Sequence, residues 1–240
     1  VFTLPANGYH HRPHAFYGNM PMTDKQGKPQ PDPEQFVSQA YNLEGKEELL
    51  AFYRQWAGEY DRQMRSRHYI SPRDVSLLLA AHLDNSDAEI LDVGCGTGMT
   101  GMELGAAGFR VMDGVDLSGE MIAVARSRDI YRRLIVGDLN EPLAIPDNTY
   151  DALVSSGTFT HGHVGPEPLP ELLRVLRPGG LLACTVHFDL WHSLGFDAMF
   201  ARLMSSGCIG CVDISEGPYF KNEENSGWFC LYRKTTKSGG

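Results

Sequence analysis

The sequence contains no apolar run that approaches the roughly 18–20 residues needed to cross a bilayer. Its opening stretch, VFTLPANGYHHRPH, lacks the basic segment followed by an apolar segment that marks a secretory signal. The stretch also lacks an initiator Met, which we interpret as the sign of a processed product or of a piece of a longer chain. We therefore expect a cytoplasmic protein with no membrane partner.

Basic residues are scarce relative to acidic ones. The chain has 21 Lys and Arg against 30 Asp and Glu, which gives a formal net charge of -9 at pH 7. Proteins that bind duplex nucleic acid usually present a basic face, because neutralising phosphates supplies most of their affinity. The acidic balance therefore argues against nucleic acid as an obligate partner.

Cysteine is sparse and irregularly spaced. The five cysteines do not form an even, closely spaced set, so we expect no disulfide framework and a reducing compartment. Cys208 and Cys211 form one C-x-x-C pair without a second pair or a nearby His, which is weak evidence for zinc. We expect these two and Cys230 to be small buried strand residues, and we predict no metal site.

The chain does contain a clear succession of segments. Residues 1–33 are rich in proline and lack apolar periodicity, which predicts an extended N-terminal arm. The rest, residues 34–240, reads as one α/β domain. We expect a helical cap over residues 34–86, a core over residues 87–188 and a C-terminal region on the substrate side over residues 189–240.

Within the domain, strand-like and helix-like patterns alternate. Strands separated by helices form a parallel doubly wound sheet. The last two strand patterns have no helix between them, which predicts an antiparallel hairpin at the far edge. The sequence thus predicts a Rossmann-like, doubly wound, mostly parallel sheet of seven strands with an N-terminal helical cap. Strands are expected at residues 89–94, 109–117, 134–139, 150–157, 181–188, 208–215 and 228–234, and helices at 46–64, 72–83, 99–108, 118–128, 170–180 and 196–207.

A glycine loop, ILDVGCGTGMTGMEL, follows the first expected strand of the core. Gly96, Gly98 and Gly101 satisfy G-x-G-x-x-G, and Asp116 lies about 20 residues on, as a nicotinamide-dinucleotide site requires. Asp92 stands at the end of the strand, however, where a carboxylate repels a nearby pyrophosphate. Such an acid suits a ligand with an ammonium or sulfonium group and no phosphate, which favours S-adenosylmethionine.

The longer string ILDVGCGTG resembles the first motif of the class I S-adenosylmethionine-dependent methyltransferases. GVDLS, GDLNEPL, YDALVSSGTFTH and LLRVLRPGGLL resemble the later motifs of that family, and they follow in the expected order. AFYRQWAGEYD and SSGTFTHGHV are similar to the Williams–Beuren-region methyltransferase-like proteins and their bacterial relatives. The resemblance covers roughly residues 49–188. It implies a methyltransferase with S-adenosylmethionine as cofactor and S-adenosylhomocysteine as product.

By this resemblance, the loop holds the methionine part of the cofactor, and the next two strand ends hold the ribose and adenine. An aromatic stripe on the N-terminal helix packs in the core or covers the cofactor, since a Tyr of this helix closes over the cofactor in similar proteins. The implied cofactor-binding residues are Asp92, Gly94, Cys95, Gly96 and Gly98 for methionine, Asp116, Leu117 and Met121 for ribose and adenine, Asp138 and Leu139 for adenine, Ser155 and Gly157 near sulfur, and Tyr53, Trp56 and Tyr60 from the stripe.

Candidates for a proton-transferring role are His161, His163 and Tyr60. The two histidines follow the fourth expected strand of the core, where the acceptor should enter, and the pKa of His suits proton transfer near neutrality. Either one alternatively caps a backbone carbonyl, and an acceptor that arrives deprotonated needs no base. His187, Trp191 and His192 follow the next strand and line the acceptor pocket or pack at its rim.

The acceptor is expected to be a small molecule methylated at N, O or S by in-line displacement. No N-P-P-Y or D-P-P-Y follows the fourth strand, and no Asp-Asp-Asn set suggests a magnesium-dependent catechol site. The alternative is a non-catalytic module that binds the cofactor and regulates a partner or a fused domain. A nicotinamide reductase is a third interpretation that rests on G-x-G-x-x-G alone. The oligomeric state stays open.

Overall fold

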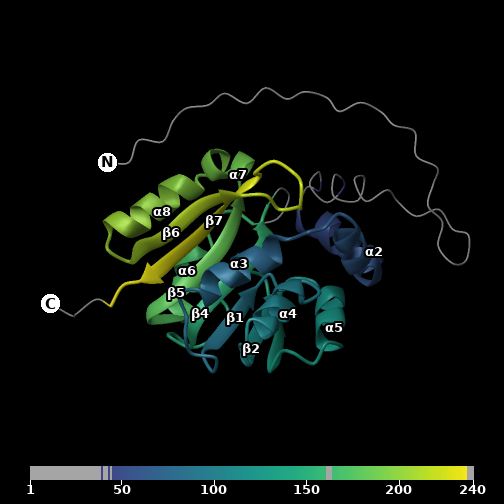
Figure 1. Ribbon diagram of the computed structural model, residues 1–240, viewed down its shortest axis with the longest axis horizontal. Helices are drawn as coiled ribbons and strands as arrows, with labels where there is room; N and C mark the ends of the chain where they lie inside the picture. The colour runs from purple at the N-terminus through teal and green to yellow at the C-terminus, as the bar shows by residue number, and fades with distance from the viewer. Residues whose placement is uncertain (1–38, 40–42, 44, 161–163, 237–240) are drawn as a thin grey trace, which may run out of the picture. The chain divides into compact units, whose positions relative to one another are not determined.

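The computed structural model describes residues 39, 43, 45–160 and 164–236. All of these residues belong to the unit Pro33–Gly240, and the arm predicted over residues 1–33 lies outside the described part. A seven-stranded sheet carries helices on both faces (Figure 1).

The strands lie in the order β3-β2-β1-β4-β5-β7-β6. The first five strands of the chain run parallel, whereas β7 pairs antiparallel with both β5 and β6. The predicted fold class is therefore confirmed, including the antiparallel C-terminal hairpin at the edge. The strands are β1 (Glu89–Val93), β2 (Val111–Asp116), β3 (Arg133–Val136), β4 (Tyr150–Phe159), β5 (Leu176–His187), β6 (Ile209–Gly217) and β7 (Gly227–Lys234).

Two apolar clusters cover the two faces of the sheet, because successive strand residues point to opposite sides. In β1, Ile90 belongs to one cluster, and Leu91 and Val93 belong to the other. Helices α3 and α4 pack on the Ile90 face, and α6 and α8 pack on the opposite face. The helices are α2 (Lys46–Ser66), α3 (Ser71–Ala80), α4 (Met99–Ala106), α5 (Gly119–Arg126), α6 (Leu169–Val175), α7 (Phe188–Ser193) and α8 (Phe196–Ser205).

The boundary between α6 and β5 differs from the prediction. The helix expected over residues 170–180 ends at Val175, and β5 begins at Leu176 rather than at residue 181. A Cβ on Gly180 would lie 2.7 Å from the carbonyl oxygen of Asp151. The chain therefore runs directly against β4 here, and only glycine permits that approach.

Candidate active site

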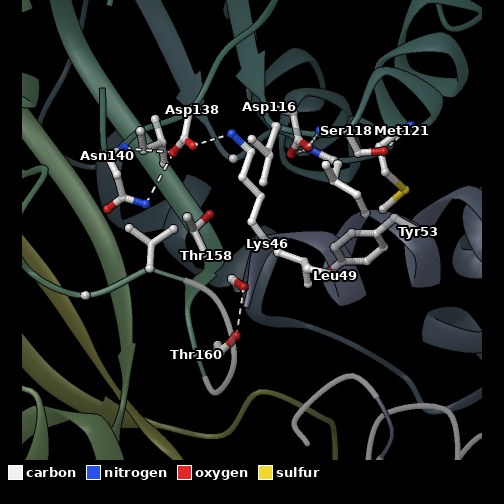
Figure 2. A pocket seen from close by; sticks show the side chains of 18 of the residues that line it. Lys46, Leu49, Tyr53, Asp116, Ser118, Met121, Asp138, Asn140, Thr158 and Thr160 are labelled. Carbon is white, nitrogen blue, oxygen red and sulfur yellow. Dashed lines mark hydrogen bonds and ion pairs between the residues drawn. The ribbon is translucent and has the colours of Figure 1, made fainter. Parts of the chain in front are cut away.

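A pocket of about 500 Å³ lies at the carboxyl ends of β1 to β4, where α2 covers them (Figure 2). Strand β1 lies between β2 and β4, so the order of the strands reverses at β1. Open α/β sheets bind ligands at such a switch point. The lining residues are Gly45, Lys46, Leu49, Leu50, Tyr53, Tyr60, Gly94, Gly96, Asp116, Leu117, Ser118, Met121, Asp138, Leu139, Asn140, Ser156, Gly157, Thr158, Thr160, Val164, Gly165 and Leu194.

Two glycines of the loop after β1 line this pocket. Gly94 and Gly96 have φ angles of 67° and 52°, in the left-handed region that glycine adopts at little cost. A Cβ on Gly94 would lie 2.1 Å from Oγ1 of Thr158, so the loop is drawn tightly against β4. At Gly96 the nearest atom to a Cβ would be Cε of Met121, at 3.6 Å. The loop backbone at Gly96 is therefore open to a ligand.

The third glycine of G-x-G-x-x-G has a different use. A Cβ on Gly101 would lie 2.3 Å from the hydroxyl oxygen of Tyr131, which crosses α4 at this point. That hydroxyl donates a hydrogen bond to Oδ2 of Asp92 over 2.6 Å. Gly98 likewise packs on the Tyr131 ring, at 3.1 Å from a Cβ placed there. Gly98 and Gly101, which belong to the pattern that suggested a dinucleotide site, thus leave space for the Tyr131 side chain.

Asp92 lies beneath the loop rather than on the pocket wall. Its side chain is fully buried, and no described residue hydrogen-bonds to its Oδ1 atom. Burial raises the pKa of Asp92 to about 7, and the hydrogen bond from Tyr131 opposes that rise. The structure therefore does not bring Asp92 into contact with the pocket that holds the other predicted residues.

Asp116 closes β2 with its carboxylate on the pocket wall. Its Oδ2 accepts the N–H of Gly96 over 2.8 Å, and its Oδ1 accepts the N–H of Ser118 over 2.8 Å. Burial raises the pKa of Asp116, and backbone hydrogen bonds from Ser118, Gly96 and Leu117 oppose the rise. Ser118, not Asp116, caps α5, since its hydroxyl accepts the N–H of Met121 over 3.2 Å. Each Asp116 oxygen keeps a lone pair for a hydroxyl donor in the pocket.

Asp138, just beyond β3, forms an ion pair that sequence analysis did not predict. Lys46, at the start of α2, places its Nζ 2.7 Å from Oδ2 of Asp138 (Figure 2). The backbone N–H of Asn140 donates to Oδ1 over 3.0 Å. The hydrogen bond from Lys46 lowers the pKa of Asp138. No sequence signal marks Lys46, because a lysine at the start of a helix is usually a solvent-exposed residue.

The aromatic stripe of α2 is divided between two environments. Tyr53 and Tyr60 line the pocket, and their ring centroids lie 6.1 Å apart. Trp56 does not line the pocket but packs against the apolar cluster, 6.3 Å from the ring of Phe52. The packing alternative therefore describes the environment of Trp56, whereas the two tyrosines face the pocket.

The remaining predicted cofactor-binding residues fall into two groups, those that line the pocket and those that do not. Leu117, Met121, Leu139 and Gly157 line the pocket, but Cys95, Gly98 and Ser155 do not. Cys95 is buried, with its Sγ 2.9 Å from a Cβ placed on Gly114. The Ser155 hydroxyl donates to the carbonyl of Val93 over 2.9 Å and joins β4 to β1.

The wall beyond β4 contains the residues that sequence reasoning missed. Ser156, Thr158 and Thr160 supply hydroxyl groups, and Val164 and Leu194 supply apolar surface, to which Leu49 and Leu50 of α2 add. Periodicity could not identify these residues, because a ten-residue strand alternates its faces and α7 was not predicted. His161 and His163 lie outside the described residues. Trp191, 6% exposed, belongs to the core and stacks on Phe200.

The cysteines and the possible metal ligands of the described residues form no metal site. Cys184 and Cys230 are buried directly opposite each other on β5 and β7, as expected of strand cysteines. Cys211 is exposed on β6 and Cys208 is half-buried, so the expectation of burial was wrong for both. No group of three or more possible metal ligands occurs among residues 45–160 and 164–236. Within the same residues, no helix is long and apolar enough to span a membrane.

The pocket fits a nucleoside without phosphates. Its wall carries two acidic side chains, Asp116 and Asp138, and Lys46 is the single basic residue among the described lining residues. Lys46 is already paired with Asp138, so a pyrophosphate would meet net negative charge. A cationic ligand with ribose hydroxyls would instead find acceptor oxygens. Fold and pocket together define a Rossmann-like protein with a candidate cofactor pocket at its switch point.

Comparison with known proteins specifies that class. A family described as a methyltransferase domain matches residues 90–180. Methyltransferase-like protein 27 of Homo sapiens is 34% identical over 192 residues, which cover 78% of this chain and 78% of that protein. The chain belongs to the class I S-adenosylmethionine-dependent methyltransferases, and the resemblance read from the sequence is confirmed. Membership of this family implies that S-adenosylmethionine is the cofactor.

Two further proteins are similar to this chain. A malonyl-(acyl-carrier protein) O-methyltransferase of Pectobacterium atrosepticum is 33% identical over 147 residues, which cover 61% of this chain and 54% of that protein. The chain thus spans about half the length of this bacterial relative. A TehB-like S-adenosylmethionine-dependent methyltransferase of Corynebacterium glutamicum superposes with a TM-score of 0.59 at 22% identity, covering 77% of this chain and 99% of that one. This last likeness concerns the fold.

Proposed function

We propose that this protein transfers the methyl group of S-adenosylmethionine to N, O or S of a small-molecule acceptor bound in the pocket at the ends of β1 to β4. One observation carries the proposal: the Asp116 carboxylate and the open backbone of Gly96 share one wall of the pocket. A carboxylate at this place accepts hydrogen bonds from ribose hydroxyls, and a bare glycine backbone permits close approach.

The residues on the wall divide the cofactor among themselves. Asp116 and Leu117 hold the ribose, Asp138 and Leu139 flank the adenine, and the backbone at Gly94 and Gly96 receives the methionine part. Tyr53, Met121 and Tyr60 cover these groups and exclude water. Cys95, Gly98 and Ser155 support the walls from behind, and Asp92 supports the loop through Tyr131. When bound, S-adenosylmethionine supplies an electrophilic methyl group on sulfonium sulfur.

The pocket wall formed by β4 and the residues after it is the proposed acceptor side, and its composition favours a small and largely uncharged acceptor. The described residues of this wall, from β4 and its surroundings, offer hydroxyl oxygens and apolar side chains but no Lys, Arg, Asp or Glu. Such a wall orients a nucleophile by close packing, and orientation alone supplies much of the acceleration of a displacement. Tyr60 lines the pocket, and His161 and His163 remain predictions for proton transfer. The proposal also includes a cytoplasmic location and the absence of a nucleic-acid or membrane partner.

The non-catalytic alternative is not favoured. It requires the pocket to be closed on the β4 side, next to residues 155–163. Ser156, Gly157, Thr158 and Thr160 all line the open volume instead.

The test is calorimetric titration with S-adenosylmethionine and S-adenosylhomocysteine. Asp116→Ala should weaken binding of both by about 100-fold, because charge-assisted hydrogen bonds contribute about 1.5–3 kcal/mol each. Asp87→Asn serves as the control, since Asp87 precedes β1 in the sequence, is exposed and pairs with Arg110. No binding by the folded wild-type protein would refute the proposal. Once binding is established, a coupled assay for S-adenosylhomocysteine release can screen acceptors.

A further inference from the structure

Among the described residues, three ion pairs join side chains of α2 to other elements, and one of them differs from the others. Lys46–Asp138 and Arg54–Glu120 each have one partner whose side chain is more than half exposed. In Asp61–Arg128 the side chains are only 25% and 14% exposed. Water screens exposed pairs so strongly that they contribute little, whereas a shielded pair keeps its geometry. The contact between Asp61 and Arg128 is therefore the principal electrostatic tie of α2.

This pair encloses a residue of the glycine loop. Thr97, between Gly96 and Gly98, donates its hydroxyl to Oδ1 of Asp61 over 2.6 Å. Arg128, just after α5, donates from Nη2 to the other carboxylate oxygen of Asp61 and from Nε to the carbonyl oxygen of Thr97 over 2.5 Å. Thr97 is thus held at its side chain and its backbone by two groups that also hold each other.

The arrangement links the loop to the tyrosines of α2. Thr97 is 1% exposed and follows Gly96, whose backbone faces the pocket. Asp61 follows Tyr60, which lines the same pocket from α2. A displacement of Asp61 would therefore move the loop and the tyrosine relative to each other. Hydrogen bonds to a charged group are directional and relatively strong, so they maintain this spacing.

We propose that Asp61 and Arg128 are positioning residues that hold the glycine loop, through Thr97, in the conformation that receives the methionine end of the cofactor while α2 covers it. The inference rests on the proposed function for the identity of the ligand. It concerns residues that touch neither the pocket nor the reacting atoms, and that the G-x-G-x-x-G pattern does not include.

The first measurement needs no ligand. Hydrogen exchange in the peptide that spans residues 94–104 should be about tenfold faster in Asp61→Asn than in the wild type, because loss of the charge weakens both bonds to the carboxylate. Thr97→Val, which removes only the hydroxyl, should accelerate the same peptide by a smaller factor. The control is Glu59→Gln, since Glu59 lies on the same helix and pairs with Arg62 on the exposed face.

The second measurement is binding of S-adenosylhomocysteine. At a temperature where both free proteins are fully folded, Asp61→Asn should raise the Kd about tenfold, and Glu59→Gln should match the wild type. Combining Asp61→Asn with Arg128→Gln should add little, because both changes break one network. Wild-type exchange of residues 94–104 in Asp61→Asn would overturn the inference. A wild-type protein that binds no cofactor would refute the proposed function instead, and the exchange data would still decide the role of Asp61.

Discussion

At the scale of single residues, burial separates two acids that look alike in the sequence. Asp92 and Asp116 each end a parallel strand and each resemble a motif acid. The Asp92 side chain is sealed beneath the loop with one oxygen on Tyr131, whereas Asp116 reaches the pocket wall. The difference arises from Tyr131, which follows α5 and crosses to β1 only in the folded molecule.

The raised pKa of Asp92 predicts a pH-dependent stability. Burial raises this pKa from 3.8 to about 7, so between these values the folded protein binds more protons than the unfolded chain. Stability from this group is therefore lost as pH rises through that range. Asp92→Asn cannot titrate, so its melting temperature relative to the wild type should increase from about pH 5 to about pH 8. A difference that stays constant over this range would contradict the prediction, and Asp87→Asn is the control.

At the scale of elements, close packing decides where helices and strands begin and end. The helix expected up to residue 180 stops at Val175, because Gly180 is needed to bring β5 against the Asp151 carbonyl. In α4, glycine within a helix costs stability relative to alanine, yet Gly101 allows Tyr131 to cross. Local propensity is overruled in both places by contact with a neighbouring element.

Helix α4 offers a direct comparison of two glycines. Gly101→Ala should destabilise the protein by about 1–3 kcal/mol, because the new methyl group would overlap the buried Tyr131 ring. Gly105→Ala should be neutral or stabilise by up to about 1 kcal/mol, since the nearest atom to its Cβ would be Cε of Met112 at 4.0 Å. Urea unfolding measures both changes. Equal effects of the two substitutions would show that the Tyr131 contact does not matter.

At the scale of the whole molecule, the order of the strands creates the site. The pocket lies where β1 is flanked by β2 and β4, so the glycine loop, Asp116, Asp138 and Ser156 converge from separate parts of the chain. Helix α2 adds Tyr53, which Figure 2 labels, and Tyr60 to the lining of the pocket. Under the proposed function, Asp116 and Asp138 on this wall accept hydrogen bonds from a cationic nucleoside.

Ligand-dependent melting tests this preference on the whole protein. S-adenosylhomocysteine at about 100 times its Kd should add about 2.7 kcal/mol of stability, which corresponds to a rise of about 5–10 °C in the melting temperature. NAD and NADH should leave the melting temperature unchanged, because the described lining offers a pyrophosphate no basic side chain except Lys46, which is paired with Asp138. Stabilisation by NADH alone would restore the interpretation as a nicotinamide enzyme.

Much of the fold and part of the site could be predicted from the sequence. Alternating apolar periods and glycine stops are local signals, and they determine the parallel core and the hairpin of β6 and β7. The resemblance of the sequence motifs to those of the methyltransferases was enough to single out Asp116, Gly94, Gly96 and Asp138, and all four line the pocket.

Only the tertiary structure decided which of these residues meet. The ion pairs of Lys46 with Asp138 and of Asp61 with Arg128 join positions 92 and 67 residues apart. No periodicity encodes such contacts, because they depend on how α2 lies across the strand ends. The same docking places Tyr60 on the pocket wall and leaves Trp56 off it, although both belong to one aromatic stripe and both pack against the same apolar cluster. Sequence by itself determined the elements and their chemistry, and packing between distant elements determined the walls of the pocket.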